Sequence, residues 1–316
     1  QVAPQFSRSR LEAGRIYLSE KVFDRALEVL NQGFSGVGGE DERAQYHYLL
    51  GKVRVGMEDY DRAVVEFTQA IETTPNPVLK EIAYYDRGTS YSRLERYDEA
   101  VQDLKGLVDS ANARISGPAQ RMLGLAYLKL NRQAEAIDSY GRLARTATDP
   151  IVQAEYLVLM LELYLELGQY DEAIATGRQV LAMDLEDRKE GRDYWIKEQV
   201  YYFIGECQQR LGQIDALMAT YATGLKLYPD SYYSPDMAYA LGALLFQQDR
   251  LDEATERLAD FIIDFPASPN TPYAYYYLGY AHFNLREFGP AQKVFATLAQ
   301  QFSSAEMAPE ALIRAA

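Results

Sequence analysis

A short pattern of one hydrophobic residue, two polar residues and one small residue recurs along the chain. Its clearest copies are Phe23–Ala26, Tyr60–Ala63, Tyr97–Ala100, Tyr170–Ala173 and Leu251–Ala254. Weaker copies end at Ala136, Leu217 and Ala291, so the eight end positions are 37, 37, 36, 37, 44, 37 and 37 residues apart. A nearly fixed spacing of this length is typical of an array of small structural repeats. We expect each repeat to be two antiparallel helices of roughly 12–16 residues.

Glycine occupies a second fixed place, twelve residues before the small residue that ends each copy. Seven of the eight copies have it, at Gly14, Gly51, Gly88, Gly124, Gly205, Gly242 and Gly279. Glycine inside a helix costs roughly 0.5–1 kcal/mol relative to alanine, so its recurrence at one phase indicates a close approach of two helices. We predict that these glycines are helix-packing residues and that the alanine ending the pattern lies opposite. The fifth copy has Leu161 instead, which should loosen or tilt that helix pair.

The spacing of these residues resembles the tetratricopeptide repeat family, whose pattern has Leu-Gly, a Tyr three residues later, an Ala, an aromatic residue four further on, and a Pro. Leu50-Gly51 leads to Ala63, Phe67 and Pro75, and the Tyr appears as Tyr17, Tyr91, Tyr127 and Tyr164. The resemblance covers essentially the whole chain, although the family's usual period is about 34 residues. It implies an all-α fold, an α-solenoid of about eight and a half helix–turn–helix repeats forming a right-handed superhelix.

A single array of repeats is therefore predicted over residues 1–316. The predicted repeats are 7–43, 44–80, 81–116, 117–153, 154–197, 198–234, 235–271, 272–308 and an incomplete ninth, 309–316. The longest interval contains the polar stretch 186–193, which we interpret as a solvated loop.

Charge and composition exclude several classes of function. The net charge is −14, which disfavours nucleic acid as a partner. No apolar run reaches the ~20 residues of a membrane helix. Two histidines, His47 and His282, and one cysteine make a zinc site improbable, and no phosphate-binding or dinucleotide motif occurs. Acidic pairs such as Glu99 and Asp103 are interpreted as solvated helix faces. We therefore expect no enzyme activity and no cofactor, and Cys207 should be a buried, inert thiol.

Tyrosine recurs at the place in the first helix that faces the concave groove in the family that this chain resembles. With the glycine counted as position eight, position five holds Leu11, Tyr48, Tyr85, Arg121, Val158, Tyr202, Tyr239 and Tyr276. In the eighth repeat, a single helical face carries Tyr273, Tyr276, Tyr280 and Phe283. One interpretation is a row of tyrosines that grips an extended peptide, a helix or a glycan. The other is that these tyrosines only pack between neighbouring first helices.

Some members of this family capture C-terminal carboxylates with cations in the groove. Arg15 and Lys52 occupy position nine of the first two repeats, but the companion asparagines are missing, so the sequence supports a carboxylate-binding groove only weakly.

The ninth copy stops within its first helix, where it exposes apolar residues. Three interpretations follow: the chain is a fragment of a longer array, it stacks head to tail on another copy, or a separate partner covers the end. The candidate end-to-end contacts are Leu11, Met307, Ala311, Leu312 and Ala315.

The expected function is a non-catalytic scaffold that binds proteins or peptides in its groove, with a self-assembling filament as the alternative. The segments 265–269 and 274–279 are similar in style to repeats of bacterial cell-envelope proteins, namely outer-membrane assembly lipoproteins and the periplasmic coordinator of the Tol–Pal system. That similarity implies a periplasmic or cell-surface location, with which a start at Gln1 after removal of a signal peptide would agree.

Overall fold

The fold consists of seventeen helices, without strands, over the residues that the computed structural model describes: 4–34, 37–185 and 196–315. The chain divides into two compact units, Gln1–Thr146 and Ala147–Ala316. The polar stretch 186–193, interpreted above as a loop, lies outside the described residues.

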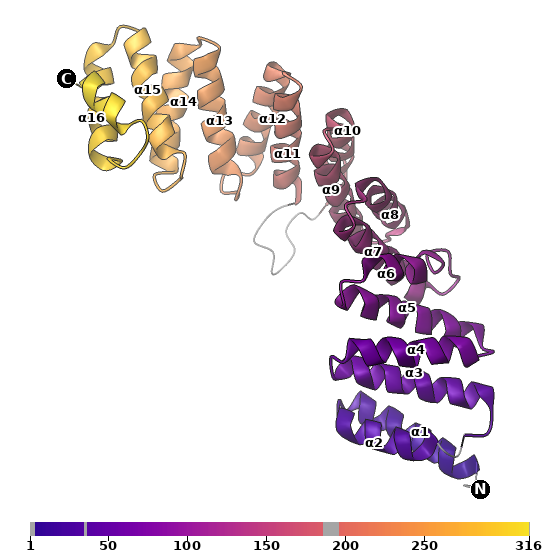
Figure 1. Ribbon diagram of the computed structural model, residues 1–316. Helices are drawn as coiled ribbons and strands as arrows, with labels where there is room; N and C mark the ends of the chain where they lie inside the picture. Colours follow the sequence, from indigo (N-terminus) through magenta and orange to yellow (C-terminus); the bar gives the residue numbers. More distant parts are fainter. Residues whose placement is uncertain (1–3, 35–36, 186–195, 316) are drawn as a thin grey trace. The chain divides into compact units, whose positions relative to one another are not determined.

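Eight helices form the N-terminal unit. They are α1 (Pro4–Ser19), α2 (Phe23–Phe34), α3 (Glu40–Gly56), α4 (Tyr60–Thr73), α5 (Pro77–Arg93), α6 (Tyr97–Lys105), α7 (Ala113–Lys129) and α8 (Gln133–Thr146). Each odd-numbered helix is the first helix of a repeat and pairs with the even-numbered helix that follows it (Figure 1).

Nine helices form the C-terminal unit. They are α9 (Pro150–Glu166), α10 (Tyr170–Leu181), α11 (Ile196–Arg210), α12 (Ile214–Leu227), α13 (Ser234–Gln247), α14 (Leu251–Asp264), α15 (Thr271–Asn284), α16 (Phe288–Gln301) and α17 (Ala308–Ala315). The order of first and second helices is as predicted, and each predicted repeat starts one to four residues inside its first helix. Several first helices, at 17 residues, are longer than expected.

The two polar residues of the recurring pattern lie in the first turn of the second helices. The aspartate, as in Asp61 and Asp252, lies in the first turn, where a negative charge is favoured by the exposed backbone N–H groups. First helices start with other devices: the Asn76 and Asp149 side chains accept backbone N–H groups, and each is followed by proline. These local preferences fix where each helix begins.

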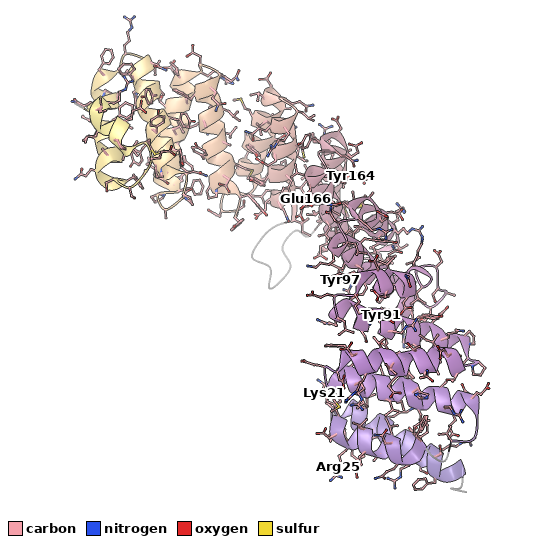
Figure 2. The ribbon with its side chains drawn as sticks, in the orientation of Figure 1. Lys21, Arg25, Tyr91, Tyr97, Tyr164 and Glu166 are labelled. Atoms are coloured by element: carbon pink, nitrogen blue, oxygen red, sulfur yellow. The ribbon has the colours of Figure 1, made fainter. Side chains whose placement is uncertain are left out.

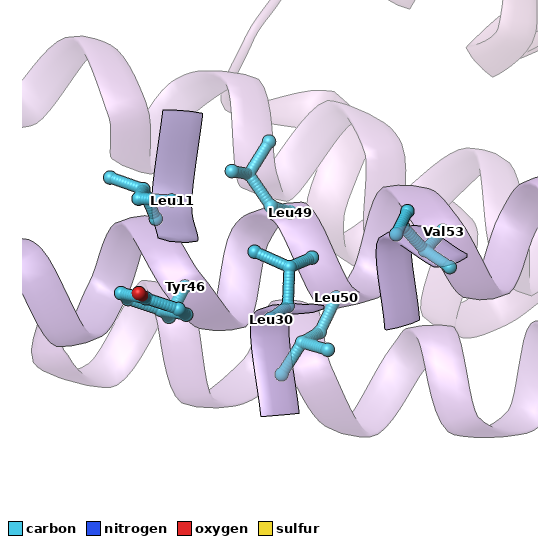
Figure 3. Close-up of a cluster of buried hydrophobic side chains, with 7 residues drawn as sticks. Leu11, Leu30, Tyr46, Leu49, Leu50 and Val53 are labelled. Atoms are coloured by element: carbon cyan, nitrogen blue, oxygen red, sulfur yellow. The ribbon is translucent and has the colours of Figure 1, made fainter. Parts of the chain in front are cut away.

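The seven repeat glycines lie where the first helix meets the second helix of the same repeat. In every case the nearest side chain is large and stands sixteen residues later: Leu30, Phe67, Leu104, Tyr140, Tyr221, Leu258 and Phe295. The prediction that the pattern's alanine lies opposite the glycine is therefore wrong. The large side chain one helical turn further on fills the gap, because a gap left empty would lose packing contacts. Leu30, which faces Gly14, belongs to the buried cluster of the first two repeats (Figure 3).

The fifth repeat uses the same contact with the sizes exchanged. Leu161 of α9 is fully buried, and the residue sixteen positions later is Gly177 of α10. A Cβ at Gly177 would lie 2.8 Å from Leu161 Cδ1. The prediction that Leu161 loosens this helix pair is wrong, because Gly177 supplies the space that the other repeats provide with their first-helix glycine.

Eight equivalent turns join first helices to second helices. Each contains one residue with positive φ, seven positions after the repeat glycine or Leu161: Lys21, Glu58, Glu95, Asn131, Gly168, Gly212, Asp249 and Arg286. In each turn the next N–H donates to the carbonyl five residues back, as Arg96 does to Tyr91 at 2.9 Å, which closes the helix end. Figure 2 labels Lys21, the positive-φ residue of the first turn, and Tyr91, the residue of α5 whose carbonyl accepts this hydrogen bond in the third repeat.

The positive φ at Gly212 allows a prediction about the backbone alone, since a Cβ there would meet nothing within 4 Å. Gly212→Val should lower the free energy of unfolding by about 1–2 kcal/mol, because β-branched residues disfavour this conformation. Gly212→Asn should cost much less, because Asn131 already adopts the same conformation in the fourth repeat. Denaturant unfolding of the two variants checks this, and equal losses would contradict it.

Candidate functional site

The first helices α11, α13 and α15 of the C-terminal unit line an open cavity of about 290 Å³, which we name the C-terminal groove. Its lining residues are Tyr202, Glu206, Gln209, Tyr221, Asp236, Tyr239, Ala240, Ala243, Leu244, Gln247, Asn270 and Tyr277. The volume is at the lower limit for small-molecule pockets, so the cavity has room for about one long side chain rather than a large ligand.

Aromatic rings form the walls of the C-terminal groove. The Tyr202 ring stacks on Tyr233 at 4.8 Å between centroids and is nearly parallel to Tyr221 at 6.3 Å. The Tyr239 ring contacts Phe261 and Tyr277, at 5.8 and 6.4 Å. These contacts hold the rings in place and leave Tyr202 and Tyr239 half-buried. Two predicted groove tyrosines therefore pack between helices and also line a cavity.

Two carboxylates enter the same cavity from different helices. Glu206 of α11 accepts a hydrogen bond from the Tyr221 hydroxyl at 3.3 Å, and Asp236 of α13 accepts one from the Asn270 amide at 2.9 Å. Neither carboxylate forms an ion pair with any residue in the described part of the chain, and no Lys or Arg lines the cavity. Burial, together with the negative charges of Glu206 and Asp236, raises the pKa of Tyr202 to about 12.

The other predicted groove residues of the eighth repeat are partly covered by α17. The hydroxyls of Tyr276 and Tyr280 both donate to Glu310, and the Arg314 guanidinium lies over the rings of Tyr280 and Phe283. Tyr273 is 43% exposed. These contacts are intramolecular, and on this face Tyr273 and Phe283 remain exposed whereas Tyr276 and Tyr280 are half-buried.

In the N-terminal unit the predicted groove residues are tied to neighbouring repeats. Tyr48 donates to Asp86 of the next first helix at 2.9 Å, and Lys52 pairs with the same carboxylate at 3.1 Å. Tyr85 is half-buried on α5. Arg15 donates to Gln45 at 3.0 Å. Both cations considered for carboxylate binding are thus already engaged within the chain.

The remaining position-five residues differ in exposure. Leu11 and Val158 are buried, whereas Arg121 is exposed. Leu11 is only 7% exposed and belongs to the cluster in Figure 3, which makes it a core residue rather than an end contact. Among the other candidate end contacts, Ala311 is buried, and Met307 and Ala315 pack partly against α16. Only Leu312 is largely exposed.

The groups considered for chemistry are paired or buried. His47 contacts Glu66 at 2.7 Å and His282 contacts Glu287 at 2.6 Å. Asp103 is not part of a solvated face as predicted: it is buried and accepts two hydrogen bonds from Arg87, because the third repeat has Arg87 where others have an apolar residue. Cys207 is buried, and burial raises the pKa of its thiol to about 11.

Nowhere among the described residues do three or more His, Cys, Asp or Glu side chains gather as metal ligands would. Within the same residues, none of the helices has the length and hydrophobicity needed to cross a bilayer.

Sequence reasoning missed Glu206, Asp236, Asn270 and Tyr277. A signal existed for the first of them, since Glu206 occupies position nine, the same position at which Arg15 and Lys52 drew attention. Asp236 had no such signal, because its approach to Glu206 depends on how α13 packs beside α11.

Solved structures with the same fold are numerous. The C-terminal part of a TPR repeat-containing protein from Cytophaga hutchinsonii is 16% identical, with a TM-score of 0.58 over 85% of this chain and 99% of that one. The structure of Naa15/Naa10 bound to HypK-THB is 12% identical, with a TM-score of 0.56 over 99% of this chain and 49% of that one. The apo form of RapI is 10% identical, with a TM-score of 0.52 over 98% of this chain and 96% of that one. A search of curated proteins found no match. At these identities the likeness shows the fold alone.

Sequence models described as tetratricopeptide repeat match five stretches of the chain. One matches residues 85–150 and 239–306, and a second matches 44–77, 154–187 and 198–231. Together they span both units and most of the predicted repeats. The chain is a member of the tetratricopeptide repeat family, an all-α solenoid of the kind that typically serves as a scaffold for protein–protein interaction.

Proposed function

We propose that the chain is a non-catalytic scaffold that holds a segment of a partner protein in the C-terminal groove. The observation that carries this proposal is the open cavity between α11, α13 and α15, in which fixed tyrosine rings alternate with hydrogen-bonding side chains. Half-exposed tyrosine is enriched at binding hot spots because its ring supplies contact area and its hydroxyl a polar handle. An extended peptide can lie along the first helices and insert a side chain into the cavity.

Selection from a random peptide library displayed on phage, against the immobilised chain, tests this function. We expect recovered peptides whose binding is weakened at least tenfold by Ala240→Trp, which fills the cavity from its lining. The matched control is Ala222→Trp on the exposed side of the second helix α12. Failure to recover peptides, or equal binding to both variants, would contradict groove binding.

Self-assembly is the alternative function, and exposed apolar side chains of α17 support it. Leu312 and Ile313 are 65% and 76% exposed. A head-to-tail polymer would show a mass that rises with concentration in light scattering and filaments in negative-stain microscopy. A constant monomeric mass would exclude it and leave the C-terminal groove as the main adhesive surface.

We also propose a bacterial extracytoplasmic setting. Its support is the similarity in style of the segments 265–269 and 274–279 to repeats of cell-envelope proteins. Fractionation of the source cells followed by immunoblotting tests it, and a purely cytoplasmic signal would exclude it.

A further inference from the structure

At several places in the chain an arginine guanidinium lies over a tyrosine ring and also pairs with a carboxylate. Arg96 lies 4.7 Å from the centroid of the Tyr91 ring and donates to Glu99 at 2.8 Å. Arg132 lies 4.7 Å from the Tyr127 centroid and also donates to its neighbouring glutamate, Glu135. A cation over a tyrosine ring gains from the ring's negative face, and the carboxylate adds charged hydrogen bonds.

The same combination occurs between helices in the eighth and ninth repeats. Arg314 of α17 lies 5.4 Å from the centroid of Tyr280 of α15, and Glu310 accepts the hydroxyl hydrogen bond of that tyrosine. Arg314 also approaches Glu310 to 4.0 Å. Here the arginine, the tyrosine and the carboxylate all come from this chain.

The C-terminal groove contains the tyrosine rings and the carboxylates but lacks the cation. Tyr202 and Tyr239 form its walls, and Glu206 and Asp236 project into it, whereas no Lys or Arg is among its lining residues. Both carboxylates are close enough to raise the pKa of Tyr202 and of Tyr221. Two carboxylates therefore share one small space whose lining contains no Lys or Arg.

We propose that the partner segment held in the C-terminal groove presents an arginine side chain, which inserts between Glu206 and Asp236 and against the tyrosine rings that line the cavity. This inference rests on the proposed function and names the chemistry of its partner. Arginine is favoured over lysine because its planar guanidinium can stack on a ring and donate to two carboxylates at once. The Gln209, Gln247 and Asn270 side chains, which also line the cavity, provide hydrogen bonds to the partner's backbone.

A small probe tests the arginine site independently of the peptide selection. N-acetyl-arginine N-methylamide is titrated into isotope-labelled chain, with the citrulline analogue, a neutral isostere, as the matched probe. The arginine probe should shift the amide resonances of Gln209, Ala240 and Asn270 and bind about tenfold more tightly than the citrulline probe. Equal binding of the two probes, or shifts located elsewhere, would overturn the proposal.

Charge-neutral variants locate the binding energy. Glu206→Gln and Asp236→Asn keep the acceptor atoms used by Tyr221 and Asn270, so the fold should be retained. The double variant should weaken the arginine probe about tenfold and leave the citrulline probe unchanged. Glu256→Gln with Asp260→Asn, two exposed residues of α14, makes the same charge change outside the groove and should have no effect.

The outcomes separate the two proposals. Peptides that bind the groove without arginine, and lose nothing on replacement of arginine by citrulline, would overturn the arginine site while groove binding stands. A selection that yields no groove peptide would contradict the proposed function, whereas a positive arginine titration would still show the cation site. Binding of the arginine probe should also weaken as salt concentration rises, since the attraction is electrostatic.

Discussion

Gly279→Leu should lower the free energy of unfolding of the C-terminal unit by about 3 kcal/mol. A Cβ at Gly279 would lie 2.6 Å from Cε1 and 2.8 Å from Cζ of Phe295, a ring that is 1% exposed and has little freedom to move. A leucine side chain adds three further carbons at the same point. The helices α15 and α16 must then separate or Phe295 must leave the core.

Gly289→Leu is the matched control for this variant. Gly289 is also helical, as the second residue of α16, but a Cβ there would meet nothing within 4 Å. Leucine at that place should change the stability by at most about 1 kcal/mol, because the gain from replacing a helical glycine is offset by the strain of a side chain directly before Pro290. Circular dichroism in denaturant measures the stabilities, and amide hydrogen exchange should show loss of protection first in α15 and α16. Equal behaviour of the two variants would show that the helix contact is misassigned.

Exchanging the two residues of the fifth repeat should rescue variants that are each strongly destabilised. Leu161→Gly should cost about 4 kcal/mol, since it removes a fully buried side chain and places glycine inside a helix. Gly177→Leu should cost about 3 kcal/mol, because a Cβ would lie 2.8 Å from Leu161 Cδ1 and 2.9 Å from Ile204 Cδ1. Combined, they recreate the arrangement of the other repeats.

The double variant is therefore expected to be more stable than either single variant. A coupling of about 2 kcal/mol or more between the two substitutions would be the signature of a shared contact. Additive losses in denaturant unfolding would refute the size exchange. Leu161→Gly paired with Gly168→Leu, which alters a glycine outside this contact, should show no rescue.

Much of the fold could be predicted because the same residue types recur at equivalent positions of each repeat, where the same packing is required. A single glycine within a helix has many explanations, but seven at one phase indicate a contact. The partner of the glycine was misassigned, because the small alanine is the conspicuous residue in the sequence, whereas close packing requires a large one such as Phe295 opposite the gap. Leu161 was misjudged for a related reason. Its compensating residue, Gly177, lies sixteen positions later, in the second helix of the repeat. Only the packing of the two helices brings these two positions into contact.

The candidate site was only half predictable. Tyr202 and Tyr239 were identified from their recurrence. Glu206 had only its place at position nine as a signal and Asp236 had none, because a charged residue on a solenoid helix normally marks a solvated face. Their importance arises from convergence of two helices on one cavity. Conversely, Tyr48 and Tyr276 are equivalent to Tyr239 in the sequence pattern, yet the hydroxyl of each donates a hydrogen bond to an acidic residue of the next repeat.

The eight turns with positive φ offer a set of attachment points for spectroscopy. All eight residues are exposed, and six of them already carry ordinary side chains, which shows that the turn keeps its shape whatever points outward. The one native thiol, Cys207, is buried with a raised pKa and would compete little for a maleimide dye. Pairs of cysteines could be introduced at two turns of one unit, such as Glu58 and Asn131 or Asp249 and Arg286. Dyes attached to them would measure the distance between repeats. Energy transfer between dyes could then report how each unit stretches or tightens as a partner binds.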